Sequence, residues 1–334
     1  MKFGIRIPSY AWPDLTYEGA RRLKEYCRKV EELSFDAIWV IDHFIPTPIL
    51  YVVSWMEPLT VLSFAAAVTE RIRLGTGILV LPFRNPVLLA KEVATLDHLS
   101  GGRFILGVGG GWDPKEFQVM GVSLKERGER TDEALEIVRR LLTEENVSFE
   151  GRYYKFQDLT IYPRPRKMPP VWVAGGSLTH AAGAPDKPYM AKSVLRRIAQ
   201  ADAWIGRSSG SDPEDIRRDL GEVKEYLRSV GRDPATLIYA HTQFLHLVDT
   251  SDGEEALSLQ RPIFERVMGT HRSIDDLRAS YLMGTTEEIV ARIEGLRRVG
   301  IQYLILNPLT DDIEQLERIA SQIADRFKDC PVPL

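Results

Sequence analysis

The strongest constraint on the fold of this chain is a regular alternation of short apolar segments with longer amphipathic ones along its whole length. The apolar segments are rich in β-branched residues, as are strands buried on both faces of a sheet, and the amphipathic ones have helical spacing. Strands are expected over residues 3–7, 35–41, 72–80, 103–108, 171–174, 203–205, 236–248 and 301–306. No linker separates these segments, so we expect residues 1–334 to form a single domain.

Two architectures accommodate such an alternation, an open doubly wound sheet and a closed barrel. A doubly wound sheet usually carries a glycine-rich dinucleotide fingerprint on its first turn, where this chain has Pro8-Ser9-Tyr10. We therefore predict an α/β fold, a (β/α)8 TIM barrel, with two additions. Residues 147–162 alternate aromatic and polar side chains, which predicts a hairpin insertion after the fourth helix. Residues 252–280 predict a helical excursion after the seventh strand.

Composition excludes several classes of function. A net charge of −4 gives no electrostatic case for binding nucleic acid. No apolar run approaches the roughly 20 residues of a membrane-spanning helix, and the first residues show no secretory signal. Cys27 and Cys330 lie at opposite ends of the chain, which fits a reducing compartment. We expect a cytoplasmic protein that has neither nucleic acid nor membrane as a partner.

A glycine run marks the end of the fourth predicted strand. Gly107, Gly109, Gly110 and Gly111 fall within five positions, and Trp112 follows them. Glycines let a backbone come close to a flat or phosphorylated ligand, because no side chain intervenes. A tight turn that needs positive φ is the alternative, but one or two glycines would satisfy it. The run is not a dinucleotide fingerprint, since the third glycine of that motif is absent. We expect it to form the floor of a ligand site.

In a barrel of this kind the loops at the carboxyl ends of the strands build the site. Asp42 and His43 follow the second predicted strand, and an imidazole suits proton transfer near neutral pH. A helix cap or a structural hydrogen bond is the alternative for this pair. Two other strand ends, GGS at 175–177 and GRS at 206–208, predict a phosphate cradle of backbone N–H groups and one guanidinium. No spacing of histidines or cysteines is typical of a metal site, so no metal is expected.

Over most of its length the chain resembles the bacterial-luciferase superfamily of luciferase-like flavin and deazaflavin oxidoreductases. The matching segments include FDAIWVIDHF, RIRLGTGILVLPFRNP, TLDHLSGGRFILGVGGGW and PPVWVAGGS. The resemblance implies a homodimer packed through its early helices and a flavin-type ring bound without covalent attachment in the barrel mouth. It also implies a non-prolyl cis peptide behind that ring, at Gly77-Ile78.

The resemblance further implies roles for individual residues. His43 or Asp42 would handle a substrate proton, and Trp55 and Trp112 would line the substrate pocket. The expected cofactor-binding residues come from the carboxyl ends of several strands. Those expected beside the ring are Thr76, Gly77, Ile78, Gly109, Gly110 and Gly111, and those expected to contact the phosphate are Gly175, Gly176, Ser177, Arg207 and Ser208.

The Asp-His pair favours the deazaflavin branch, in which coenzyme F-420 exchanges hydride with a small organic substrate. The first alternative is a monooxygenase that uses oxygen and reduced FMN from a partner flavin reductase. The second is a barrel that binds flavin without turnover. Two features depart from the family pattern. Some deazaflavin enzymes have a Glu after the glycine run, and here that acid is missing or replaced by Asp113. Residues 177–193 also exceed the short link that the family usually has between its glycine pair and the following helix.

Overall fold

The strands of the chain form a closed parallel barrel. The computed structural model describes every residue except 11–17, 48–49, 178–188, 207–212, 329 and 331–334. Among the described residues the main sheet has nine strands in the order β3-β2-β1-β11-β10-β9-β8-β5-β4, and a pairing of β3 with β5 closes it. All of these strand pairs are parallel. The predicted (β/α)8 barrel is confirmed.

The barrel strands lie close to their predicted positions, with one exception. The strand expected over residues 72–80 is interrupted at Gly77 and Ile78, which separates β3 from β4. The peptide bond between these two residues is cis, as the family resemblance implied. The bounds of the barrel strands are β1 Lys2–Arg6, β2 Ala37–Val40, β3 Arg73–Thr76, β4 Leu79–Val80, β5 Phe104–Gly109, β8 Val171–Ala174, β9 Ala203–Ile205, β10 Ile238–Leu245 and β11 Tyr303–Pro308.

Helices follow the strands and cover the outside of the barrel. Their ends carry the expected signals: α3, for example, has Asn85 accepting hydrogen bonds as its N-cap, Pro86 in its first turn and Gly101 in a left-handed conformation after its last residue. None of the described helices is long and apolar enough to cross a membrane. The helices are α1 Gly19–Glu32, α2 Pro58–Val68, α3 Pro86–Ser100, α4 Pro114–Val119, α5 Arg127–Thr143, α6 Lys192–Ile198, α7 Pro213–Ser229, α8 Gly253–Met268, α9 Ile274–Ser280, α10 Thr286–Val299, α11 Ile313–Ile319 and α12 Asp325–Phe327.

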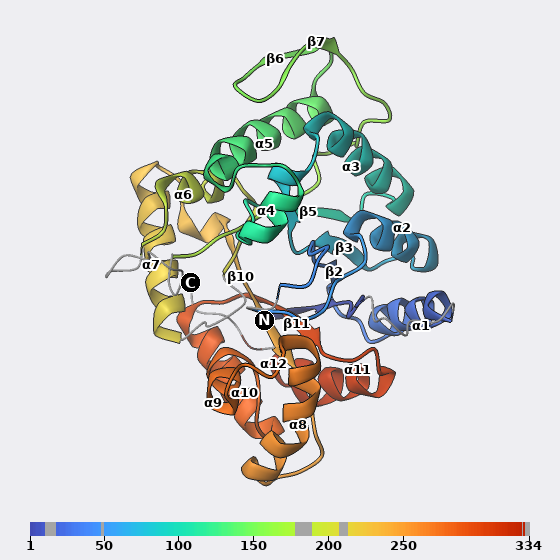
Figure 1. Cartoon of the computed structure of the whole chain (residues 1–334), viewed down its shortest axis with the longest axis vertical. Coiled ribbons are helices and arrows are strands. Elements are labelled where there is room, and N and C mark those ends of the chain that lie inside the picture. Colours follow the sequence, from blue (N-terminus) through green and yellow to red (C-terminus); the bar gives the residue numbers. More distant parts are fainter. Residues whose placement is uncertain (11–17, 48–49, 178–188, 207–212, 329, 331–334) are drawn as a thin grey trace.

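Two segments depart from the plain barrel, at opposite ends of the long axis of the molecule (Figure 1). The antiparallel hairpin of β6 (Val147–Glu150) and β7 (Lys155–Leu159) follows α5 and stands at the top of the view. Helices α8 and α9 follow β10 and lie at the bottom. Both predicted additions are confirmed.

Aromatic side chains fill the inside of the barrel. Trp39 on β2 packs against Trp172 on β8 at 4.8 Å between ring centroids, and Tyr303 on β11 lies against both rings. Gly4 on β1 and Gly75 on β3 flank the Trp39 ring so closely that a Cβ atom at either position would overlap it. Two strands therefore lack side chains at the level where the tryptophan needs the space, and the interior is packed rather than hollow.

Candidate active site

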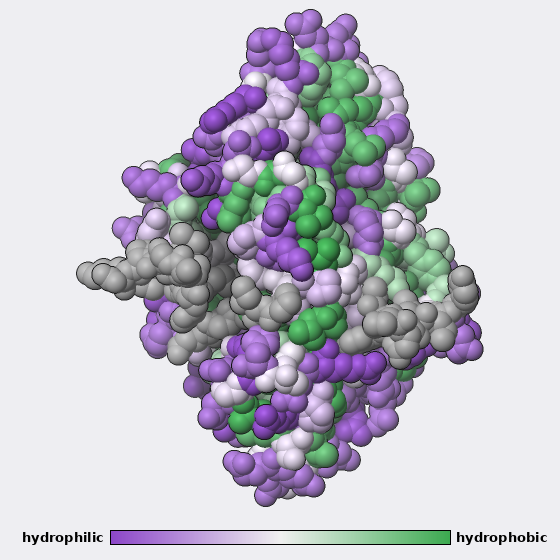
Figure 2. All heavy atoms as spheres, in the orientation of Figure 1, coloured by the Kyte–Doolittle hydropathy of each residue, from purple (hydrophilic) through white to green (hydrophobic). Residues whose placement is uncertain are grey.

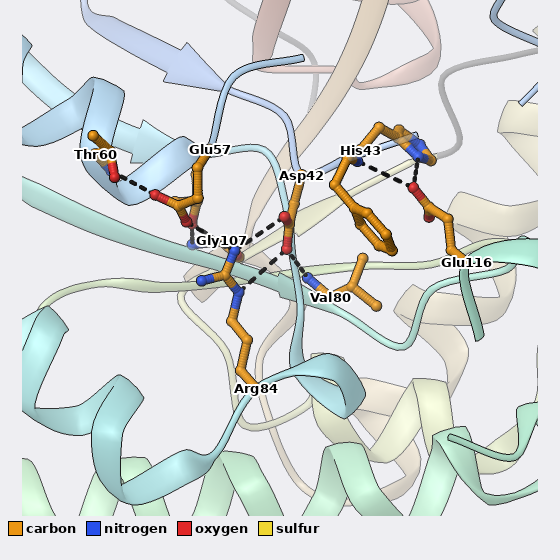
Figure 3. A network of polar contacts seen from close by, with 10 residues as sticks. Asp42, His43, Glu57, Thr60, Val80, Arg84, Gly107 and Glu116 are labelled. Carbon is orange, nitrogen blue, oxygen red and sulfur yellow. Dashed lines mark hydrogen bonds and ion pairs between the residues drawn. The ribbon is translucent and has the colours of Figure 1, made fainter. Parts of the chain in front are cut away.

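Asp42 and His43, which lie just beyond the end of β2, point in different directions (Figure 3). Asp42 turns toward Arg84, whose Nη2 and Nε donate to its two carboxylate oxygens at 3.0 and 3.3 Å. The backbone N–H of Val80 donates to the same carboxylate at 2.9 Å. Arg84 also pairs with Glu57, at 3.0 Å on its more exposed side. The Asp42 carboxylate is thus buried and engaged in holding the residues after β3 to the end of β2.

His43 turns instead toward Glu116 on α4 (Figure 3). Its Nδ1 lies 3.2 Å from Glu116 Oε1, and the backbone N–H of Phe44 donates to the same oxygen at 3.2 Å. The exposed fractions of the two side chains are 8% for His43 and 2% for Glu116. The bond to Glu116 is made by Nδ1, which leaves Nε2 of His43 for the exchange of a proton.

Sequence reasoning missed Glu116 and looked for an acid at Trp112 or Asp113. Asp113 proves to be the N-cap of α4: it accepts a hydrogen bond from the N–H of Lys115, and its other oxygen accepts one from the Thr47 hydroxyl. The signal was present in the sequence Asp113-Pro114-Lys115-Glu116, because a cap residue followed by proline starts a helix and places the third residue after the cap on its first turn. The acid that faces the histidine comes from that turn.

Three aromatic rings surround the His43 imidazole. The ring centroids of Tyr51, Trp55 and Trp112 lie 5.5, 5.7 and 5.9 Å from it. Trp55 is buried, whereas 41% of Trp112 is exposed. Both predicted pocket tryptophans therefore lie beside the histidine, with Trp112 at the solvent side and Trp55 below it.

A hollow of about 260 Å³ adjoins these rings. Its lining includes both members of the Asp-His pair. The lining residues are Asp42, His43, Phe44, Trp55, Met56, Glu57, Pro58, Phe83, Arg84 and Met120. In Figure 2 apolar side chains gather near the middle of the face where α4 lies in Figure 1; Val119 and Met120 at the end of this helix are exposed, as is Trp112 before it. A larger groove, of about 850 Å³, runs between α3 and the β6–β7 hairpin, and neither Asp42 nor His43 lines it.

The glycine run makes room mostly for the protein itself. A Cβ at Gly107 would overlap the Thr76 carbonyl, and the Thr76 hydroxyl both donates to Gly107 O and accepts from its N–H. A Cβ at Gly109 would lie 2.8 Å from the Ile78 side chain. Gly111 has a φ of +71°, and a Cβ there would lie 2.6 Å from Val80. The turn alternative thus accounts for Gly111, and the hydroxyl of Thr76 is engaged with the backbone of Gly107. Gly110 meets nothing closer than 3.4 Å.

The predicted phosphate cradle is described only in part. Gly175 follows β8, and its carbonyl accepts a hydrogen bond from the Trp204 indole at 2.8 Å. The N–H of Ser177 donates to Asp219 on α7, and its hydroxyl accepts from Arg218 at 3.1 Å. Gly176 lies between these two anchored residues. Arg207 and Ser208 lie outside the described residues. The GGS segment is therefore held in place by β9 and α7.

A family model described as luciferase-like monooxygenase matches residues 1–303. The chain belongs to this family. Relatives of this luciferase-like protein include the F420-dependent glucose-6-phosphate dehydrogenase of Amycolatopsis mediterranei, which is 39% identical over 313 residues that cover 89% of this chain and 91% of the relative. F420 in this name is coenzyme F-420.

Two solved structures share the barrel fold of the luciferase-like chain. Monooxygenase RslO1 from Streptomyces bottropensis has a TM-score of 0.79 and 24% identity, and the match covers 98% of this chain and 100% of that one. An F420-dependent secondary alcohol dehydrogenase, in complex with an F420-acetone adduct, has a TM-score of 0.78 and 20% identity, covering 97% and 98% of the two chains.

Several buried polar atoms of the luciferase-like barrel suit a flavin-type ring, whose edge carries carbonyl and N–H groups. At the carboxyl ends of β1 and β11, Nε and Nη1 of Arg6, Oγ of Ser9 and Oδ1 of Asn307 are buried without a hydrogen-bond partner among the described residues. Buried polar groups are nearly always paired in the working state of a protein. Donors and acceptors left open at one end of a barrel therefore fit a polar, planar ligand there.

Proposed function

We propose that this luciferase-like oxidoreductase uses coenzyme F-420 to exchange hydride with a small organic substrate, and that His43 handles the substrate proton. The observation that carries the proposal is the buried pair of His43 and Glu116 at the carboxyl end of the barrel. A relative at 39% identity is named as an F420-dependent dehydrogenase of glucose 6-phosphate, which supports the choice of coenzyme and a hydroxyl-bearing substrate. A second relative, at 30% identity, carries the same name.

The pair of side chains suits the removal of a proton from a hydroxyl group. When the His43 Nδ1–H donates to the Glu116 carboxylate, the lone pair of the imidazole is fixed on Nε2, and the carboxylate stabilises the imidazolium that forms. Bound coenzyme supplies the carbon that accepts or gives hydride. The rings of Tyr51, Trp55 and Trp112 surround the imidazole and limit the access of water. Asp42 acts indirectly, by holding the end of β2 through Arg84 and Val80.

Binding of the coenzyme is assigned to the same end of the barrel. The ring is proposed to lie against Gly77 and Ile78, beside Gly109, Gly110 and Gly111, with Thr76 fixing β3 to β5 behind it. The phosphate is proposed to lie over Gly175, Gly176 and Ser177, whose backbone is anchored to α7, with Arg207 and Ser208 as further donors.

The state of the protein in the cell is part of the proposal. We infer a single barrel domain that acts as a cytoplasmic homodimer packed through its early helices, as the family resemblance implies. Leu88 and Leu99 on α3 are largely exposed in the isolated chain, which supports an apolar contact there. Analytical ultracentrifugation of the wild type and of a Leu88→Glu variant tests this point, because a monomeric wild type would contradict it. A flavin reductase is needed as a partner only by the FMN alternative.

The deciding experiment measures coenzyme binding before turnover. Purified protein is titrated with coenzyme F-420 and with FMN, each oxidised and reduced, and fluorescence quenching gives the dissociation constants. We expect binding of coenzyme F-420, followed by its reduction when glucose 6-phosphate or a panel of small alcohols is added. Tight binding of FMN alone, with rapid oxygen consumption in the presence of reduced FMN and substrate, would identify a monooxygenase instead.

Substitution of the histidine tests its role. The variant His43→Ala should lower kcat by about 10²–10⁴-fold, the usual contribution of a general base, and leave the dissociation constant of the coenzyme nearly unchanged. Trp112→Ala serves as the matched control from the same ring cluster, and it should change KM more than kcat. If His43→Ala weakens coenzyme binding as much as it lowers turnover, the residue binds the coenzyme and is not the proton acceptor.

A further inference from the structure

One charged side chain lies inside the barrel where the sequence pattern predicts only apolar ones. Arg6 is the last residue of β1, and only 3% of its surface is exposed. Gly4, two residues earlier on the same face of β1, faces the rings of Trp39 and Tyr303 in the barrel interior. Arg6 therefore projects inward one layer above these rings, at the floor of the barrel mouth.

The guanidinium of Arg6 is only partly satisfied by the protein. Its Nη2 donates to the carbonyl oxygen of Gly77 at 2.8 Å. Nε and Nη1 are buried and have no hydrogen-bond partner among the described residues, and Arg6 forms no ion pair with a described carboxylate. Burial lowers the pKa of Arg6 to about 10, which leaves it charged at neutral pH. A buried cation without a counter-charge is costly, so its retention calls for an anionic group that binds there.

The surroundings of Arg6 belong to the floor proposed for the coenzyme ring. The bond to Gly77 O places the guanidinium directly beside the Gly77–Ile78 peptide. On the other side, the register of β1 with β11 pairs Ile5 with Leu306, and one residue further it places Arg6 beside Asn307. Oδ1 of Asn307 is another buried acceptor without a partner among the described residues. A planar ring resting on Gly77 would therefore meet open N–H donors and an open carbonyl acceptor together.

We propose that Arg6 binds the coenzyme ring and stabilises the negative charge that this ring gains with hydride. The inference rests on the proposed function. In the oxidation of an alcohol, the C–H bond of the substrate breaks and its hydrogen leaves with both electrons to form a C–H bond on the ring. The hydroxyl proton passes to Nε2 of His43, and a carbonyl forms on the substrate. The ring would gain one negative charge with the hydride in this step, and the open N–H groups of Arg6 would donate to it.

The test compares the affinity of two redox states rather than turnover. Dissociation constants of oxidised and reduced coenzyme F-420 are measured for the wild type, Arg6→Met and Arg6→Lys under anaerobic conditions. Arg6→Met should weaken binding of the reduced form about tenfold or more relative to the oxidised form, the size expected for a hydrogen bond to a charged group. Arg6→Lys retains the charge and should lose less. The control is Arg22→Met, which makes the same change of net charge at an exposed arginine that pairs with Asp311 on the surface.

Coenzyme-free protein supplies an independent measurement. Because Arg6→Met removes a buried and partly unsatisfied cation, the coenzyme-free variant should melt no lower than the wild type; a clearly lower melting temperature would overturn the proposal. Equal loss of affinity for both redox states, or no loss, would overturn it and leave the proposed function intact. An unchanged ratio of the two dissociation constants, together with a raised KM for an anionic substrate, would also overturn the proposal. A wild type that binds neither coenzyme F-420 nor FMN would refute both proposals together.

Discussion

The pair of Asp42 and Arg84 allows the structural role of Asp42 to be separated from a chemical one. The substitution Asp42→Asn keeps the shape of the side chain and removes its charge. Oδ2 of Asp42 accepts both the Val80 N–H at 2.9 Å and Nε of Arg84 at 3.3 Å, and an amide oxygen in its place can still accept both bonds. The NH2 group then replaces Oδ1, so the 3.0 Å bond from Nη2 of Arg84 is lost. Arg84 itself keeps its pairing with Glu57 at 3.0 Å, so the cation is not orphaned.

The magnitude follows from these contacts. A buried hydrogen bond to a charged group contributes about 1.5–3 kcal/mol. One such bond is lost and the second no longer has a charged acceptor, but Arg84 is partly exposed and keeps one carboxylate, so we expect the free energy of unfolding to fall by about 2–3 kcal/mol. The melting temperature should then drop by a few degrees. Turnover should fall less than in a variant that lacks His43.

Denaturation in urea, followed by fluorescence of the six tryptophans, measures the change. Glu57→Gln is the matched control, because it removes the exposed partner of the same arginine and should cost less than about 1 kcal/mol. The double variant Asp42→Asn with Arg84→Met should lose less than the sum of the two single variants, since both break the same contacts. A fully stable Asp42→Asn protein that has lost its activity would refute this reasoning and identify Asp42 as the group that handles the proton.

Three further predictions concern single residues, and the second and third have a matched variant. Glu116→Gln, which removes the charge opposite the imidazole of His43, should lower kcat about tenfold or more while the melting temperature changes little; an unchanged kcat would remove this residue from the proposed mechanism. Gly111→Ala should destabilise the protein by about 2–4 kcal/mol, because its Cβ would lie 2.6 Å from a valine, whereas Gly121→Ala has a similar φ, +66°, but open space and should cost only about 1 kcal/mol. Equal losses would contradict the contact. Burial lowers the pKa of His246, so folding favours its neutral form. The protein therefore has its full stability above about pH 6.5, the pKa of a free imidazole, and loses part of it as the pH falls below that value. His246→Gln should therefore lose less thermal stability than the wild type between about pH 7 and 5, and the exposed His98→Gln should behave as the wild type does.

Much of the architecture could be predicted from the sequence because burial controls the pattern of each strand. The segment Ala203–Ile205, for instance, is apolar throughout and forms β9 over those same residues. The hairpin after α5 was recognisable from its change of period. The position of the cis peptide came from the resemblance alone, since nothing in the composition of Gly77-Ile78 distinguishes the bond between them.

The partners of the site residues could not be predicted, because they are set by contacts between distant segments. Arg84 lies 42 positions from Asp42, in the loop after β4, and nothing in the Asp-His motif indicates it. Glu116 lies 73 positions from His43, and only the direction of a helix of two turns brings it there. The sequence did indicate an unusual position at Arg6, because a charged residue stands there between Ile5 and Ile7 in a buried segment.

The packing of Trp39 between Gly4 and Gly75 also has a kinetic consequence. It closes the barrel below the mouth, so every ligand must arrive and leave by the same end. A molecule that reaches Arg6 lies deeper than one that touches Trp112, and the outer molecule blocks the exit of the inner one. We therefore expect compulsory order in steady-state kinetics, with the coenzyme binding first and leaving last. The product derived from the substrate should then inhibit noncompetitively with respect to the coenzyme.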